Sequence, residues 1–226
     1  MKDTVKGTAK DTVAGYHAAH LPEDPNRAVV WRAVAEHLSG WIRPYSHVLE
    51  IGAGYCDWIN NVQAERRVAV DIWPRLAAHA DRGVQPEVLD VSRDLRTLGT
   101  SVFDVVLASN VLEHFDPDTV ASVVGDVHAV LKPGGLFLIV QPNFRLASRR
   151  YFDDYTHRAI FTDVSLPALL RAHDFRINLV KARFLPYSMR RAVVPIREWL
   201  VRAYLLSPIK PMAGQMLVIA QRPHGD

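Results

Sequence analysis

The feature that most constrains the fold is a short apolar run, His47–Ile51, that leads directly into Gly52-Ala53-Gly54. Glycine permits a tight turn and lets backbone amides approach a ligand where a Cβ would intervene. Such a turn links a strand to the next element of an α/β fold and faces a ligand at the carboxyl end of the strand. The pattern predicts a ligand site here, although an ordinary strand-to-helix turn has the same glycines.

Short apolar runs alternate with helical stretches along the middle of the chain. The expected strands are His47–Ile51, Arg67–Val70, Pro86–Leu89, Phe103–Ala108 and Leu136–Gln141. The helices expected between them are Asp57–Gln63, Pro74–Ala80 and Thr119–Leu131. This alternation predicts an α/β domain in which a largely parallel sheet is covered on both faces.

The two ends of the chain add further elements. A helix is expected at Arg27–Leu38, and the last third reads as helix, strand, helix and strand at Leu166–Ala172, Phe175–Ala182, Val193–Leu206 and Met216–Gln221. We divide the chain into an N-terminal arm and helix over 1–46, a possible lid over the substrate, and a main domain over 47–226. No repeat or low-complexity linker separates the two, so one continuous domain is expected.

Carboxylates follow the second and third expected strands. Asp71 closes the second strand at about the spacing of a residue that grips ribose hydroxyls, and Asp90 follows the third. Together with the glycine turn they indicate an adenosine-bearing ligand. NAD is disfavoured, because its fingerprint needs a third glycine where this chain has Asp57, which would repel a pyrophosphate. Acidic residues such as Glu50 and Asp57 suit a cationic sulfonium better.

The ordered motifs resemble those of class I S-adenosylmethionine-dependent methyltransferases. The matching stretches are Glu50–Gly54, Asp71, Asp90-Val91, Phe103–His114 and Leu131–Leu136. One departure is Cys56, where many members carry glycine. The resemblance implies a Rossmann-like three-layer sandwich with seven strands, mostly parallel, whose last strand, Met216–Gln221, is antiparallel.

The resemblance also implies S-adenosylmethionine as the cofactor and a role for each motif. The Glu50–Gly54 turn would lie against the methionine moiety, Asp71 would bind the ribose, and Asp90 with Val91 the adenine. Asn110 would face the methionine end. The full set of implied cofactor contacts is Glu50, Gly52, Ala53, Gly54, Asp71, Ile72, Asp90, Val91 and Asn110.

Later segments resemble a bacterial subgroup associated with glycan and polysaccharide assembly. These segments are Gln141–Arg145, Tyr151–His157 and Arg183–Tyr187. We therefore expect O-methylation of a small-molecule or glycan acceptor. The residues expected at this substrate are Tyr16, His17, Asn143, Tyr151, Asp154 and Arg158. N- or C-methylation, a catalytically silent partner subunit that binds the cofactor, and an NAD-linked reductase are the alternatives.

Two histidines are candidates for the general base. His157 follows an acidic pair in a tyrosine-rich loop, where Asp154 could orient its ring, but a surface histidine in a polar turn fits equally. His114 follows the fourth strand beside Glu113, and its alternative is a residue that only packs beneath the cofactor. A third histidine, His17, lies on the N-terminal arm, where a disordered tail is the competing interpretation.

Several classes of site and partner are not expected. No metal is predicted, since Ser109-Asn110 stand where a catechol-type magnesium site needs an acid directly after the fourth strand. The net charge of only +3 argues against a nucleic-acid substrate. One cysteine and the lack of a signal or long apolar run favour the cytoplasm. The Val193–Leu206 helix is expected to cover the sheet, with docking to a membrane or partner as the alternative. The oligomeric state is not predicted.

Overall fold

A computed structural model describes residues 23–187 and 196–224 of the chain. Its seven strands form one sheet in the order β3-β2-β1-β4-β5-β7-β6. The strands are β1 (His47–Ile51), β2 (Arg66–Asp71), β3 (Val84–Val88), β4 (Phe103–Ser109), β5 (Leu131–Pro142), β6 (Arg176–Pro186) and β7 (Ala213–Gln221). Strands β1 to β5 pair in parallel, whereas β7 lies antiparallel between β5 and β6. The predicted sheet and its antiparallel last strand are confirmed.

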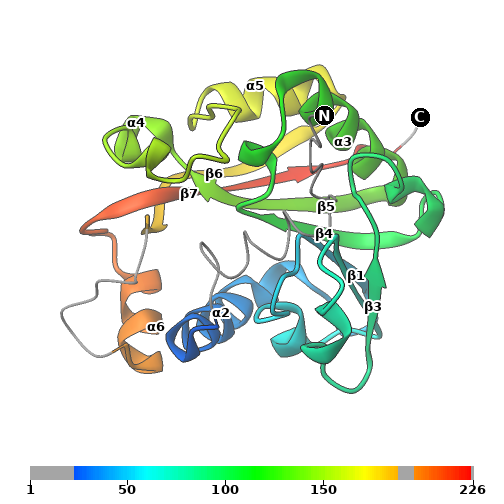
Figure 1. Cartoon of the computed structure of the whole chain (residues 1–226), viewed down its shortest axis with the longest axis horizontal. Coiled ribbons are helices and arrows are strands. Elements are labelled where there is room, and N and C mark those ends of the chain that lie inside the picture. Colours follow the sequence, from blue (N-terminus) through cyan, green and yellow to red (C-terminus); the bar gives the residue numbers. More distant parts are fainter. Residues whose placement is uncertain (1–22, 188–195, 225–226) are drawn as a thin grey trace, which may run out of the picture.

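Helices cover both faces of this sheet, so the fold has the three predicted layers (Figure 1). The helices are α2 (Pro25–Leu38), α3 (Pro117–Val130), α4 (Phe144–Ala147), α5 (Ser165–Ala172) and α6 (Glu198–Leu206). Side chains of α3 and α5 share one core cluster with the sheet, and those of α2 and α6 share the other. Because α2 packs in the same core as β1 and β5, the helical part of the arm belongs to the α/β unit.

Capping residues set where the two long helices begin. The Asp116 side chain accepts a hydrogen bond from the Thr119 amide, and Pro117 occupies the first turn of α3. Asp24 and Pro25 do the same for α2, with the Asn26 amide as donor. The first turn of α2 is thereby placed beside the glycine loop, where it becomes part of the site.

The two helices predicted between the first three strands are wrong. Asp57–Gln63 contains only a 3-10 turn, η2 (Ile59–Asn61), and Pro74–Ala80 only η3 (Leu76–Ala78). Asn60 and Asn61 use their side chains on backbone groups, Asn60 on His79 O and Asn61 on Asp57 O, both at 2.9 Å. Such bonds compete with helix formation. The chain therefore crosses this part of the sheet in tight turns.

Helix α6 is shorter than the predicted Val193–Leu206 segment, whose residues 193–195 lie outside the described residues. It packs on α2: Val201 and Leu205 are buried, and Arg202 pairs with Glu36 at 2.8 Å. This favours the sheet-covering role. Trp199 nevertheless remains 66% exposed.

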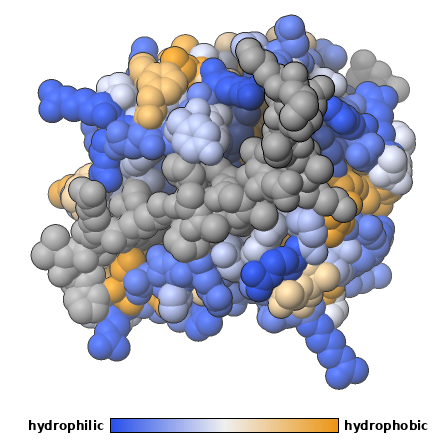
Figure 2. Space-filling view, in the orientation of Figure 1, coloured by the Kyte–Doolittle hydropathy of each residue, from blue (hydrophilic) through white to orange (hydrophobic). Residues whose placement is uncertain are grey.

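The face drawn in Figure 2 is mainly polar, with apolar surface in separate patches. Within the described residues, no helix combines the length and apolar character that crossing a bilayer requires.

Candidate active site

The glycine loop adopts a conformation that side chains would obstruct. Gly52 and Gly54 have positive φ angles, +68° and +50°. A Cβ on Gly52 would lie 2.2 Å from Cγ2 of Val111. The Gly54 amide donates to Oδ2 of Asp71 at 2.8 Å, which ties the loop to the end of β2. The loop thus leaves open space above the carboxyl end of β1.

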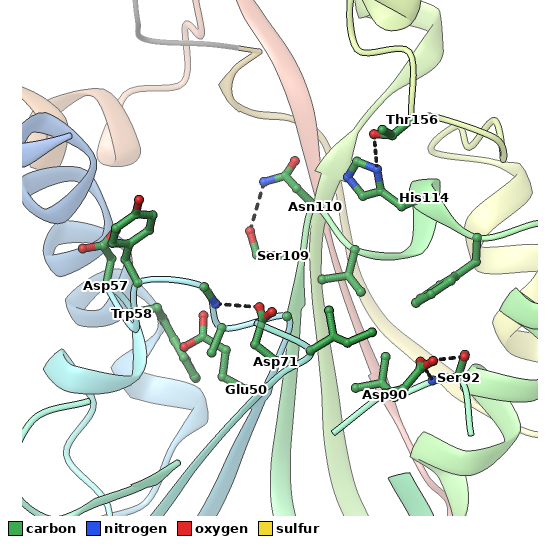
Figure 3. Close-up of a pocket in the computed structure, with 18 of the residues that line it drawn as sticks. Glu50, Asp57, Trp58, Asp71, Asp90, Ser92, Ser109, Asn110, His114 and Thr156 are labelled. Carbon is green, nitrogen blue, oxygen red and sulfur yellow. Dashed lines mark hydrogen bonds between the residues drawn. The ribbon is translucent and has the colours of Figure 1, made fainter. Parts of the chain in front are cut away.

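That space is a cavity of about 620 Å³, within the usual range for small-molecule sites. It lies at the carboxyl ends of β1, β2 and β4 and beside the loop after β3 (Figure 3). Residues from the sequence predictions on its wall are Glu50, Gly52, Ala53, Gly54, Asp71, Ile72, Asp90, Val91, Asn110, His114 and Arg158. Segments distant in sequence are therefore brought to one cavity.

Asp71 is buried and holds the loop on both sides. Its Oδ2 accepts from the Gly54 amide and its Oδ1 from the Trp73 amide, each at 2.8 Å. A carboxylate oxygen has two lone-pair sites, so Asp71 can still accept from two hydroxyls of a ligand. Its orientation is fixed before any ligand binds.

Glu50 is an acid in an unfavourable place for a charge. It is 5% exposed and accepts one hydrogen bond, from the Ile59 amide at 3.1 Å. Burial raises its pKa well above the ordinary value, and the nearby charges of Asp57 and Asp71 add to the effect. A cationic group in the cavity would stabilise the carboxylate and reverse that shift.

The cavity wall beyond β3 is largely apolar and includes one acid, Asp90. The Asp90 Oδ1 accepts from the amide and hydroxyl of Ser92, at 3.0 and 2.6 Å, so the carboxylate is held in a tight turn. Val91, Leu89 and the 45% exposed Ile72 line the same part of the wall. A planar heterocycle with an exocyclic donor fits this combination.

Helix α2 supplies a wall that the sequence analysis did not predict. Arg27 and Trp31 both line the cavity. The Arg27 Nε lies 2.5 Å from Oδ2 of Asp57, and its guanidinium lies over the Tyr55 ring, 4.3 Å from the centroid. These contacts join α2 to the glycine loop. No local pattern signals them, because Arg27 and Asp57 are distant in sequence.

His114 lies on the cavity wall near Asn110, a non-glycine residue with a φ of +51° at the end of β4 (Figure 3). The Thr156 hydroxyl donates its proton to Oδ1 of Asp154 at 2.5 Å, so its 2.9 Å contact with Nδ1 of His114 requires that nitrogen to be the donor. Backbone groups of Thr156 and Asn110 also form hydrogen bonds with the ring. Burial, with a smaller contribution from His157, lowers the His114 pKa to about 4, so the ring is neutral at neutral pH.

His157 lies behind His114 rather than on the cavity wall. The two ring centroids are 5.0 Å apart, and the Tyr151 ring packs on the other side at 4.6 Å. Its Nε2 lies 4.0 Å from Oδ2 of Asp154. Burial lowers the pKa of His157 as well. It can act on a ligand only through His114 or with a shift of the loop.

The remaining predicted substrate residues are spread over three environments. Asn143 and Tyr151 are buried and do not line the cavity: Asn143 caps α4, and the Tyr151 hydroxyl donates to Ala159 O at 2.5 Å. Asp154 acts on the cavity through Thr156, and Arg158 is half-buried on its rim. Tyr16 and His17 lie outside the described residues.

Glu113 was not predicted as a site residue, yet it is the most unusual acid in this region. Its side chain is fully buried in the short turn η5 (Leu112–His114), and burial raises its pKa to about 8. Its backbone carbonyl accepts from the Arg158 and Ala159 amides, at 2.8 and 3.1 Å. Those bonds hold the loop of Thr156 and His157 against η5.

Comparisons with known proteins agree with this architecture. A family model described as a methyltransferase domain matches residues 24–180. A SAM-dependent methyltransferase from Archaeoglobus fulgidus superposes with a TM-score of 0.66 at 18% identity, covering 93% of this chain and 99% of that one.

Two further structures are N-methyltransferases. NodS from Bradyrhizobium japonicum WM9, in complex with S-adenosyl-L-homocysteine, gives a TM-score of 0.64 at 14% identity and covers 95% of this chain and 98% of its own. The 1,6-didemethyltoxoflavin-N1-methyltransferase of Burkholderia thailandensis, with bound 1,6-didemethyltoxoflavin and S-adenosylhomocysteine, gives a TM-score of 0.60 at 22% identity and covers 94% of this chain and 86% of its own. No curated protein matches the sequence. At these identities the structures establish the fold.

Proposed function

The chain belongs to the methyltransferase domain family, and from that premise we propose that it transfers the methyl group of S-adenosylmethionine to a hydroxyl of a small-molecule acceptor. One observation carries the proposal: fixed acids at the ends of β1 and β2, and in the turn after β3, converge on a single cavity. They are complementary to an ammonium group, a ribose diol and an adenine amino group. The cofactor-bound structures of NodS and the toxoflavin-pathway enzyme support the same donor.

In this proposal each part of the cofactor has a defined place. Glu50 faces the methionine ammonium, Asp71 accepts from the ribose hydroxyls, and Asp90 accepts from the adenine amino group. Ile72 and Val91 cover the faces of the adenine. The sulfonium is then directed toward Asn110 and His114, at the end of β4. Glu50 becomes ionised when the cation binds, so its burial contributes to recognition.

Methyl transfer is an in-line displacement in which the acceptor oxygen attacks the methyl carbon while the bond from carbon to sulfur breaks. The electron pair of that bond remains on sulfur, and S-adenosylhomocysteine is released. Positioning supplies most of the acceleration in such a reaction. The hydroxyl proton needs a base, which contributes roughly 10²–10⁴-fold. Neutral His114 is the proposed base, and His157 and Asp154 hold it in place.

The class of acceptor is a finer proposal. We propose a sugar or another polar metabolite hydroxyl, supported by the resemblance of Tyr151–His157 and Arg183–Tyr187 to enzymes of glycan assembly. Arg158 and the exposed Tyr155 at the cavity rim suit a polar ring and its substituents. A nitrogen acceptor is the second candidate, because two of the similar structures are N-methyltransferases.

The decisive experiment has two stages. Titration calorimetry with S-adenosylhomocysteine, against NAD as control, tests the donor site; absence of heat with S-adenosylhomocysteine would refute the proposal. Transfer of labelled methyl to nucleotide sugars, glycosides, phenols and amines then tests the acceptor. Binding without transfer to any of these would favour a catalytically silent subunit.

A variant separates the base from the cofactor site. His114→Gln should retain affinity for S-adenosylhomocysteine within about threefold and lose roughly 10²-fold or more in kcat. If affinity for S-adenosylhomocysteine and kcat fell by the same factor, His114 would only pack beneath the cofactor.

A further inference from the structure

The starting observation is the side chain of Glu113. It is 0% exposed, and within residues 23–187 and 196–224 neither carboxylate oxygen has a hydrogen-bond partner. Burial of an acid in this way is costly unless a donor, an opposite charge or a metal ion satisfies it. A buried acid with both oxygens open therefore indicates a missing partner.

Two histidines lie where that partner would be shared. Glu113, His114 and His157 each offer one ligand atom, and these atoms all lie within 4.8 Å of one another. The Nδ1 of His157 is buried and, among the described residues, lacks a hydrogen-bond partner. With bonds of about 2.0–2.2 Å, the ligands of a tetrahedral ion are about 3.3–3.6 Å apart. Closing on an ion therefore requires shifts of about 1 Å, within reach of side-chain rotation.

The surrounding residues orient both rings as ligands. The hydroxyl of Thr156 lies 2.9 Å from Nδ1 of His114. Oδ2 of Asp154 lies 4.0 Å from Nε2 of His157, and the buried Nδ1 has no hydrogen-bond partner among the described residues. A carboxylate or hydroxyl on the outer nitrogen is the usual support of a metal-bound histidine. Here the Thr156 hydroxyl, which donates to Asp154, contacts the His114 ring, and Asp154 lies beside the His157 ring without a hydrogen bond to it.

We propose that Glu113, His114 and His157 form a binding site for a divalent transition-metal ion of the zinc class, at the acceptor end of the cavity. Two imidazoles and one carboxylate are the ligands of open catalytic zinc sites, which keep a further position for water or substrate. His114 and Thr156 line the cavity, so that position faces the acceptor. One carboxylate with a divalent ion leaves a single positive charge, which the nearby Asp154 offsets.

This site revises the expectation that the chain holds no metal. That expectation rested on the lack of Cys and His residues at zinc spacing and of an acid directly after the fourth strand, whereas these ligands come from η5 and from the loop after η6 (Tyr151–Asp153). The use of the ion rests on the proposed function: a Lewis acid beside the acceptor would lower the pKa of the attacking hydroxyl. In that form His114 would be a ligand and not the base, and the hydroxyl proton would pass to solvent water. Binding of the metal ion does not depend on the proposed methyl transfer.

The test uses the full chain without an affinity tag, stripped with a chelator and dialysed. Zn²⁺ is titrated by calorimetry, Co²⁺ by its visible absorption, and bound metal is counted by mass spectrometry. The variants are Glu113→Gln and His157→Ala, with His173→Gln as the matched control, because His173 lies far along the chain on the end of α5. Affinity for S-adenosylhomocysteine is measured on the same samples.

We expect about one Zn²⁺ per chain and a tetrahedral Co²⁺ spectrum in the wild type and in His173→Gln. Glu113→Gln and His157→Ala should each weaken Zn²⁺ binding by about 100-fold or more while S-adenosylhomocysteine still binds. Wild-type protein that holds no metal, or variants that bind it as tightly as the wild type, would overturn the inference. If a variant does not fold, the wild-type stoichiometry and Co²⁺ spectrum decide. A wild-type protein that does not bind S-adenosylhomocysteine would instead refute the proposed function.

Discussion

Replacement of Gly52 by alanine gives a quantitative test of how the cavity is formed. The new Cβ would lie 2.2 Å from Cγ2 of Val111, and the backbone has a φ of +68°. A left-handed backbone costs a non-glycine residue about 1–3 kcal/mol. Overpacking costs about 1–3 kcal/mol more. We therefore expect Gly52→Ala to lower the free energy of unfolding by about 2–6 kcal/mol, and affinity for S-adenosylhomocysteine by about 10-fold or more.

A second substitution separates the two costs. Val111→Ala removes the methyl group that the new Cβ would meet, at a cost of about 1.6 kcal/mol for two buried carbon groups. In the double variant the overpacking disappears and the backbone cost remains. The losses in unfolding free energy of the two single variants should then sum to about 1–3 kcal/mol more than the loss in the double variant. Gly40, where an added Cβ would meet nothing within 4 Å, is the matched control.

Urea unfolding without ligand measures these differences, and calorimetry with S-adenosylhomocysteine follows the site. Gly40→Ala should be neutral or stabilise by up to about 1 kcal/mol. The steric explanation is refuted if Gly52→Ala unfolds with the same free energy as the wild type. It is also refuted if the two substitutions are strictly additive, because Val111 would then not be what the Cβ meets.

Three further predictions concern the acids of the cavity and the surface of α6. Asp71→Asn keeps one oxygen acceptor but places an NH₂ group against a backbone amide. The affinity for S-adenosylhomocysteine, measured by calorimetry, should therefore fall about 100-fold or more. Retained affinity would contradict the proposed binding of the ribose hydroxyls by Asp71. Because burial raises the pKa of Glu50, the ligand-free fold loses stability as the pH rises above the ordinary pKa of glutamate. Glu50→Gln should therefore have a higher melting temperature than the wild type at about pH 8, and no such gain at about pH 4. An equal gain at both pH values contradicts this explanation. Trp199 and Leu206 are exposed apolar residues of α6. If α6 only covers the sheet, the wild type should not sediment with anionic liposomes; sedimentation that Trp199→Ala abolishes would establish the membrane alternative.

Local chemistry made the donor half of the site predictable. A strand that ends in glycines, and acids that end the next strands, keep their positions whatever the rest of the chain does, because parallel strands bring their carboxyl ends to one edge. Asp71 and Asp90 therefore lie on the cavity where the sequence placed them. The same reasoning failed for Asp57–Gln63, where side-chain bonds to the backbone replaced a helix.

The acceptor half depends on contacts between segments far apart in the chain, which no spacing rule predicts. Arg27 reaches Asp57 across the glycine loop, and Thr156 reaches His114 from a loop beyond the fifth strand. The sequence identified His157 as a candidate but not that it lies behind His114. Nor did it identify Glu113, because a glutamate after a strand is normally a surface residue; only its complete burial marks it.

The proposed donor and acceptor halves of the site are held in place by different groups, and this difference leads to a prediction. Backbone amides fix the donor half: Gly54 and Trp73 hold Asp71, and Ser92 holds Asp90. Side chains from α2, η5 and the loop after η6 form the acceptor half. If these proposed roles are right, a substitution in η5 or in the loop after η6 changes the acceptor, or the metal proposed beside it, and leaves the proposed cofactor contacts in place. Affinity for S-adenosylhomocysteine and acceptor specificity should therefore vary independently among variants. A set of acceptor-side substitutions in which every loss of transfer is matched by an equal loss of cofactor affinity would show that the halves are one unit.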